Sequence, residues 1–184
     1  PGSAATSNQK FTFSAWVKRS KLGSITVINE GGSSANTDVL SIGWGAYTDQ
    51  IVFQAAGYNV IVTNAVYRDP SAWYHIVLAC DTTQATASNR VRLYVNGSEV
   101  TSFTQDNRAS VITQNYTFSY MNQSGQIQSI GRSYNYGYYW DGYMAETIMV
   151  DGQQLAVTAF GSTNATTGVW QPADRKSTRL NSSH

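Results

Sequence analysis

A dense run of aromatic residues is the part of this chain that most clearly suggests ligand chemistry. Six aromatic residues fall among the ten positions from Tyr134 to Tyr143, and Tyr134, Tyr136 and Tyr138 alternate with Ser, Asn and Gly. Aromatic rings pack on the apolar C–H faces of sugars, and the tyrosine hydroxyl adds a hydrogen bond. We expect these three tyrosines to lie in an exposed loop and contact a ligand, with ordinary loop packing as the alternative.

The charge around this run indicates the class of ligand, and a second aromatic segment is a further candidate for ligand contact. Arg132 is the only cation nearby, which favours a neutral sugar over a phosphate or an acidic polymer. Trp44 and Tyr47, within the string Gly-Trp-Gly-Ala-Tyr, form a smaller second candidate for the same kind of contact. The predicted binding residues are therefore Tyr134, Tyr136, Tyr138, Trp44 and Tyr47.

Acidic side chains do not form the pair that glycoside hydrolysis needs. Retaining glycosidases hold two carboxyl groups about 5–5.5 Å apart, which on one strand requires positions two or four residues apart. The only close acidic set, Asp141, Glu146 and Asp151, is spaced by five, so that neighbours fall on opposite faces of a strand. We expect no catalytic residues and no enzymatic activity.

Histidine and cysteine chemistry is also sparse. His75 is the only histidine before the last residue, so a multi-histidine metal site is excluded, and a histidine-based catalytic triad lacks a nearby Asp and Ser set. We expect His75 to be a structural residue. Cys80 is the only cysteine, so no internal disulfide forms, and its alternation with apolar residues predicts a buried thiol.

The scaffold that must position these residues is predicted to be all-β. Among the 184 residues, Val and Ile total 25 against 6 Leu, and aromatic residues reach 12%. Branched and aromatic side chains suit pleated surfaces. The net charge of +1, the lack of basic runs and the lack of a bilayer-length apolar stretch argue against nucleic-acid partners and membrane insertion.

Period-two patterns place short strands along the chain. Lys10–Arg19 alternates apolar and polar residues, and Trp73–Asp81 is nearly continuously apolar, which predicts a central strand. Asn96-Gly97 predicts a tight hairpin, and 153–160 is the only expected helix, of about two turns at most. Further strands are expected at 25–29, 39–44, 50–55, 58–63, 91–96, 126–132 and 138–150. Many short strands at this spacing predict a β-sandwich or barrel.

Specific strings carry a family resemblance. Trp73–Val77 and Arg92–Gly97 resemble the signature of laminin-G-like domains in the concanavalin A-like lectin/glucanase superfamily, and Phe11–Val17, Ile130–Arg132 and Trp140–Glu146 agree in order. The resemblance implies a two-sheet antiparallel jelly roll with a first strand upstream of Pro1 and with Trp140 in the core. It is nearest to modules of phage and environmental viral structural proteins, which implies a virion or extracellular location.

The resemblance also implies a bound calcium ion, because laminin-G-like modules often bind calcium at the rim of the sandwich. Calcium takes six to eight oxygen ligands, several of them carboxylates. Four aspartates stand at expected loop or strand ends without forming a dense cluster: Asp38, Asp49, Asp81 and Asp106. We therefore expect no cofactor and no metal ligand set, with a rim-bound calcium as the alternative.

The last residues do not resemble the rest of the chain. Asp174–His184 reads DRKSTRLNSSH, which is the in-frame translation of a common sequencing-adapter oligonucleotide. We interpret residues 1–172 as one laminin-G-like domain and residues 173–184 as a non-native tail of a gene read from environmental DNA. Without the tail residues the net charge is −1, so no function is built on them.

Three functions follow as hypotheses. The favoured one is a non-catalytic carbohydrate-binding or adhesion module of a phage tail-type virion protein or a cell-surface protein. Its partners would be a glycan or cell-surface receptor and other virion subunits. The first alternative is a purely structural jelly roll of a virion protein. A glycoside hydrolase is the second alternative, against which the unpaired carboxylates argue.

Overall fold

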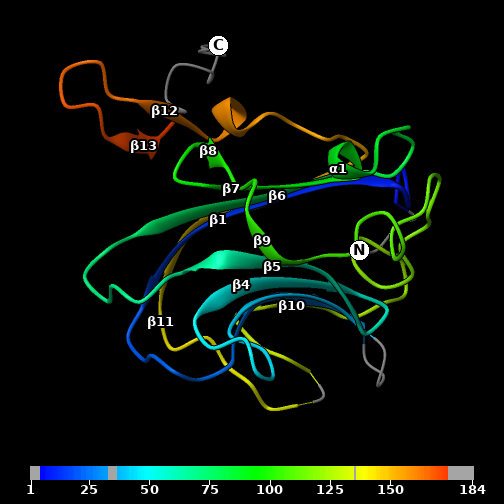
Figure 1. Ribbon diagram of the computed structural model, residues 1–184, viewed down its shortest axis with the longest axis horizontal. Coiled ribbons are helices and arrows are strands. Elements are labelled where there is room, and N and C mark those ends of the chain that lie inside the picture. Colours follow the sequence, from blue (N-terminus) through cyan, green and yellow to red (C-terminus); the bar gives the residue numbers. More distant parts are fainter. Residues whose placement is uncertain (1–4, 33–36, 135, 174–184) are drawn as a thin grey trace, which may run out of the picture.

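Two antiparallel sheets stacked face to face form the body of the protein (Figure 1). The computed structural model describes residues 5–32, 37–134 and 136–173. The five-stranded sheet has the order β11 (Gly142–Asp151), β1 (Lys10–Arg19), β6 (Tyr74–Asp81), β7 (Val91–Val95) and β8 (Ser98–Glu99). The six-stranded sheet has the order β10 (Gln128–Ile130), β2 (Thr26–Gly31), β3 (Asp38–Ile42), β4 (Gln50–Ala55), β5 (Tyr58–Val66) and β9 (Phe103–Asp106). The predicted all-β antiparallel sandwich of jelly-roll type is confirmed.

The main core lies between the sheets, as the alternation of β1 predicts. Phe11, Phe13, Ala15 and Val17 point into it and are fully buried or nearly so. The predicted central strand is indeed central, because β6 pairs with β1 on one side and β7 on the other. Cys80 is buried in this core, as expected.

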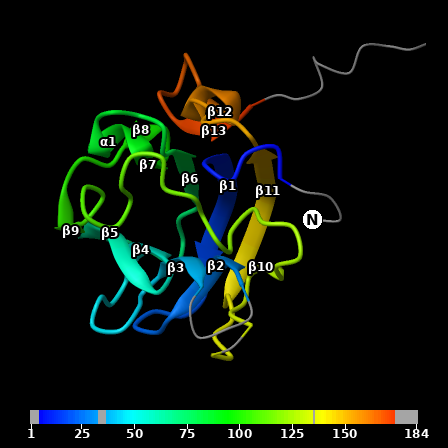
Figure 2. The same ribbon diagram turned by 90° about the vertical axis from the view of Figure 1, so that its right-hand side faces the viewer.

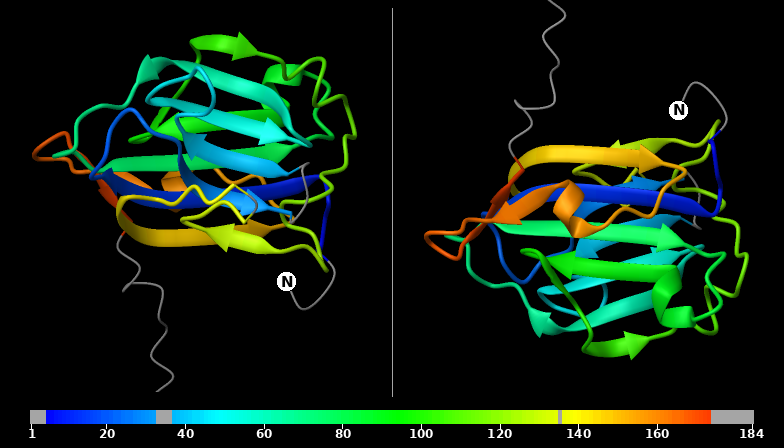
Figure 3. Two further views of the ribbon diagram at one scale, coloured as in Figure 1. Left: turned by 90° about the horizontal axis from the view of Figure 1, so that it is seen from below. Right: turned by 90° about the horizontal axis from the view of Figure 1, so that it is seen from above.

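The outer face of the five-stranded sheet is covered as well, which the sequence pattern did not indicate. A C-terminal hairpin of β12 (Gly161–Thr163) and β13 (Trp170–Pro172) lies on this face, on the side away from the six-stranded sheet (Figures 2 and 3). A second, smaller core forms beneath the C-terminal segment from Val77, Ala79, Tyr94, Val157 and Phe160. Thr12, Ser14 and Trp16 of β1, expected on a polar face, are therefore buried.

Helical structure amounts to two single turns among the described residues. The helix expected at 153–160 is only a 3₁₀ turn, η1 (Val157–Ala159). Its first residues stay extended because the Thr12 hydroxyl donates to the carbonyl of Gln153 (2.7 Å) and accepts from the N–H of Leu155 (2.8 Å). The other turn, α1 (Ala87–Arg90), lies between β6 and β7.

Two further predictions concern membrane-spanning helices and the C-terminal tail. In the part of the chain that the structure covers, no helix has the length and apolar character needed to cross a bilayer. The tail interpretation falls on residues 174–184, which lie outside the described residues, and it stays a prediction.

Candidate functional site

The aromatic run folds as a narrow hairpin between β10 and β11. The N–H of Trp140 donates to the carbonyl of Gly131 (2.8 Å), and the N–H of Ser133 donates to the carbonyl of Tyr138 (2.7 Å). Between these bonds, Arg132 and Tyr139 form an antiparallel bridge. Near the tip, Gly137 adopts a φ of +64°, a left-handed conformation that costs glycine little. The pairing fixes the backbone of this segment, which leads into β11 at the bottom of the view in Figure 1.

Three of the five predicted binding residues meet in one aromatic cluster, which consists of Trp44, Tyr136 and Tyr138. The Trp44 ring meets the Tyr136 and Tyr138 rings edge-on, with centroids 5.9 and 5.8 Å away. Tyr136 and Tyr138 lie almost parallel, at 17° and with ring centroids 6.0 Å apart, on either side of the left-handed Gly137. Tyr136 is 46% exposed, so the aromatic cluster combines fixed rings with accessible ring surface.

The other two predicted residues stand apart from the aromatic cluster. The Tyr134 ring lies under the Arg132 guanidinium at 5.2 Å, and its backbone N–H donates to Oε1 of Glu30 (3.0 Å). Tyr47 shares a turn with Trp44, its N–H donating to the Trp44 carbonyl (3.0 Å). The loop between β3 and β4 thus contributes Trp44 to the aromatic cluster and Tyr47 to its support.

A buried ion pair lies at the base of the β3–β4 loop, and sequence reasoning missed it. Asp49 accepts from Nη1 of Arg19 (2.7 Å), from Nε of Arg68 (3.0 Å) and from the N–H of Gly23 (2.9 Å). Burial acts to raise the pKa of Asp49, but these hydrogen bonds hold it below its usual value. Arg19 ends β1 in step with the inward-facing Phe11, Phe13, Ala15 and Val17, so the alternation places it on the buried face, but no local signal revealed its partner.

The four aspartates considered for calcium are each engaged by donors of the protein. Asp38 accepts backbone N–H groups of Ala56 and Met121, and burial raises its pKa. Asp81 binds Thr83, Gln84 and Lys10, and Asp106 binds Arg108. Within the described residues, no three His, Cys, Asp or Glu side chains gather in a metal-binding arrangement. The described residues thus offer calcium no set of free carboxylates.

His75 is held by hydrogen bonds at both ring nitrogens. Nε1 of Trp170 donates to Nδ1 (2.9 Å), and Nε2 lies 2.9 Å from the Ser14 hydroxyl. Because an indole N–H can only donate, the neutral imidazole carries its proton on Nε2. That nitrogen therefore donates to Ser14 and cannot act as its general base. The arrangement is that of a structural residue rather than a nucleophile and base pair.

Acid should weaken the fold through His75. Burial lowers the pKa of His75 to about 4, whereas the unfolded chain titrates near its usual 6.5. The unfolded state binds the extra proton first, so this stabilisation is full above pH 6.5 and is lost as the pH falls toward 4. We expect a loss of roughly 2–3 kcal/mol over that window, measured by urea unfolding at a series of pH values. His75→Gln, which keeps one donor and one acceptor, should flatten the profile; an unchanged profile would contradict the assignment.

The chain matches a laminin G-type family model over residues 1–153, described as the concanavalin A-like lectin/glucanases superfamily. No curated protein matches it at a significant level. Among solved structures, domain 4 of AbnA, an extracellular GH43 arabinanase from Geobacillus stearothermophilus in complex with arabinotriose, is 20% identical with a TM-score of 0.56. The matched region covers 82% of the present chain and 64% of the arabinanase domain chain.

A heptameric SAP-like pentraxin from Limulus polyphemus is 14% identical, with a TM-score of 0.50, over 77% of this chain and 63% of that one. The chain thus spans less than two thirds of each of these two structures. At these identities the likeness shows the fold alone. This fold serves both glycoside hydrolases and non-enzymatic lectins, so function has to be argued from the site.

Proposed function

This chain belongs to the concanavalin A-like lectin/glucanase superfamily. From this premise we propose that it is a non-catalytic carbohydrate-binding module. The observation that carries the proposal is the aromatic cluster, in which two loops far apart in sequence bring Trp44, Tyr136 and Tyr138 into contact. The solved complex of a similarly folded arabinanase domain with arabinotriose supports a sugar as the ligand.

The chemistry of the aromatic cluster suits a neutral sugar. Its rings offer apolar faces for sugar C–H groups, and the two tyrosines add hydroxyl groups. Tyrosine and tryptophan lose little side-chain entropy on binding, and contacts between the rings restrict them further. The basic side chain of the hairpin, Arg132, lies over the Tyr134 ring, outside the aromatic cluster.

A non-catalytic role is supported by the positions of the acidic residues. Asp141 and Asp151 stand at opposite ends of β11, roughly 30 Å apart at about 3.3 Å per residue. Asp151 is engaged by the N–H of Thr6 and by Nδ2 of Asn122. Glu146 lines a pocket on the outer face of the five-stranded sheet. These separations do not suit a pair of carboxyl groups acting on one glycosidic bond.

We further propose that the module acts in adhesion, on a virion or another extracellular surface, with a glycan or cell-surface receptor as partner. The support is the resemblance of the sequence strings to phage structural modules and the extracellular setting of the arabinanase domain. The full-length gene would test this part, because tail-fibre or secreted-enzyme domains beside the module would identify its setting.

Alanine variants of the aromatic cluster test the sugar site. We expect Trp44→Ala, Tyr136→Ala and Tyr138→Ala each to weaken binding of the best glycan from an array by about fivefold to tenfold, the scale of one lost aromatic contact. Titration calorimetry measures the affinity, and the melting temperatures of the tyrosine variants should stay near that of the wild type.

Tyr58→Ala is the matched control for these variants. Tyr58 is 68% exposed and lies at the start of β5, outside the aromatic cluster, so its loss should leave glycan affinity unchanged. Tyr134→Ala tests whether Tyr134, which lies on the same hairpin but apart from the aromatic cluster, takes part in glycan binding. Full affinity in all three cluster variants, or no glycan bound by the wild type, would contradict the proposed function.

A further inference from the structure

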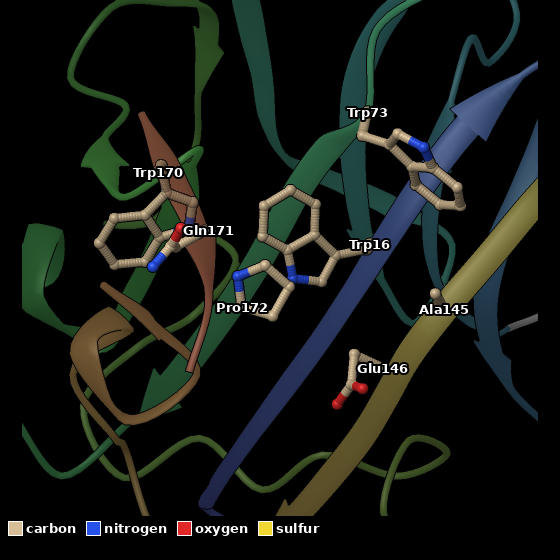
Figure 4. A pocket seen from close by; sticks show the side chains of 7 residues that line it. All are labelled: Trp16, Trp73, Ala145, Glu146, Trp170, Gln171 and Pro172. Carbon is tan, nitrogen blue, oxygen red and sulfur yellow. The ribbon is translucent and has the colours of Figure 1, made fainter. Parts of the chain in front are cut away.

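A second aromatic site lies on the outer face of the five-stranded sheet, away from the aromatic cluster. It is a pocket of about 260 Å³ between β1, β11, the start of β6 and the C-terminal hairpin (Figure 4). Three indole rings line it, from Trp16, Trp73 and Trp170, together with the carboxylate of Glu146 and the ring of Pro172. The volume equals that of about nine liquid water molecules at roughly 30 Å³ each.

Two of the three indoles are fixed by the fold. The His75 ring lies 4.8 Å from the Trp16 ring at an interplanar angle of 17°, which covers one face of that indole. Nε1 of Trp170 is held by Nδ1 of His75. Trp16 is nine-tenths buried, and its Nε1 has no hydrogen-bond partner in the structure. The pocket therefore has a rigid aromatic wall.

The third indole and the carboxylate form the accessible rim. Trp73 is 40% exposed, precedes β6 and contacts the Tyr143 ring at 6.5 Å. Its partial exposure and its position outside both cores mean that its removal should not unfold the protein. Figure 4 places it across the pocket from Trp170.

A bulge in β11 brings Glu146 to the pocket. The register of β11 against β1 changes between Ser14 and Trp16, which pair with Ile148 and Ala145, and Glu146 has a φ of +48°. Bulges redirect side chains in this way. Glu146 is exposed, forms none of the salt bridges found among the described residues, and supplies the acidic side chain of the pocket lining.

This combination selects for a cation with an apolar surface. The negative ring faces of indoles attract cations, and quaternary ammonium groups are the ligands that such aromatic surroundings favour. The Glu146 carboxylate adds charge complementarity for a cation, and Gln171 supplies the other polar side chain of the lining besides the indole N–H groups. We propose that this pocket binds a trimethylammonium group, as in choline, independently of the proposed glycan site.

Choline titration of the full chain tests the proposal, with tryptophan fluorescence and calorimetry as readouts. We expect saturable binding of choline at neutral pH, and at least about tenfold weaker binding of its neutral carbon isostere, dimethylbutanol. Glu146→Gln should weaken choline binding about fivefold and Trp73→Ala about tenfold or more, at unchanged melting temperatures. Asp141→Asn and Tyr139→Ala are matched controls, because both side chains are exposed and lie outside the pocket.

Phosphatidylcholine vesicles, compared with anionic vesicles lacking choline, distinguish a lipid headgroup from free choline as the source. Equal affinity for dimethylbutanol, full binding by both pocket variants, or no saturation by choline at about 50 mM would overturn the proposal. So would a glycan whose binding is lost in Trp73→Ala, because the pocket would then be a sugar site. The aromatic-cluster variants should bind choline normally, so failure of either proposal leaves the other distinguishable.

Discussion

Replacing Asp49 with alanine should lower the free energy of unfolding by about 3–5 kcal/mol, the usual result of removing one partner of a buried ion pair. Arg19 is 1% exposed, and its Nε and Nη2 already lack hydrogen-bond partners. The Asp49 carboxylate is therefore the only counter-charge the structure gives it among the described residues. Urea unfolding followed by intrinsic fluorescence measures the change.

Arg68→Ala is the control for this prediction. Its side chain is 59% exposed although it contacts the same carboxylate, and exposed ion pairs contribute about 0–1 kcal/mol. The double variant Arg19→Met with Asp49→Leu should recover much of the lost stability, because it removes both charges together. A loss below about 1 kcal/mol in Asp49→Ala would show that Arg19 keeps its charge compensated in another way.

Trp140→Ala should lower the free energy of unfolding by about 3 kcal/mol. The Trp140 side chain is half-buried and packs against the main core, and its removal leaves a cavity at the base of the hairpin that presents Tyr136 and Tyr138. The loss combines the transfer of the indole to water with the cavity that remains. Thermal and urea unfolding measure it.

The tyrosines of the same run are the internal comparison for Trp140. Tyr136→Ala should change the melting temperature little, because Tyr136 is exposed. Tyr138→Ala should also have a small effect, because Tyr138 is only partly buried and lies outside both cores. The opposite pattern, with Trp140 dispensable and the tyrosines essential for folding, would make the run a core element. The proposed sugar site would then lose its residues.

The predictable part of this fold is the part that depends on local patterns. The period-two alternation of β1 places Phe11 and Phe13 inward, and the apolar run at 74–81 correctly predicts a central strand. The helix expected at 153–160 failed because Thr12, over 140 residues away, holds its first residues extended. Local propensity contains no information about such a contact.

The candidate sites show the same limit. The sequence indicated Tyr136 and Tyr138 as part of one candidate and Trp44 as part of a second, but only the folded chain brings the two loops together. The pocket of Trp16, Trp73 and Trp170 was not predicted, since it combines residues from both ends of the chain. The alternation of β1 placed Trp16 on the polar face of the strand. It is buried because β13 packs over that face.

The C-terminal hairpin also determines where this module can be divided. The Trp170 indole fits against Gly97 and Gly161, where an added Cβ would lie about 2.4 and 2.5 Å from its ring atoms. The family match ends at residue 153, yet Val77, Ala79 and Tyr94 pack under residues beyond it. A boundary drawn at 153 would leave that apolar sheet face open to water and to other chains. We therefore expect a domain cut at 153 for cloning, fusion or grafting to be less stable than one that extends through Pro172.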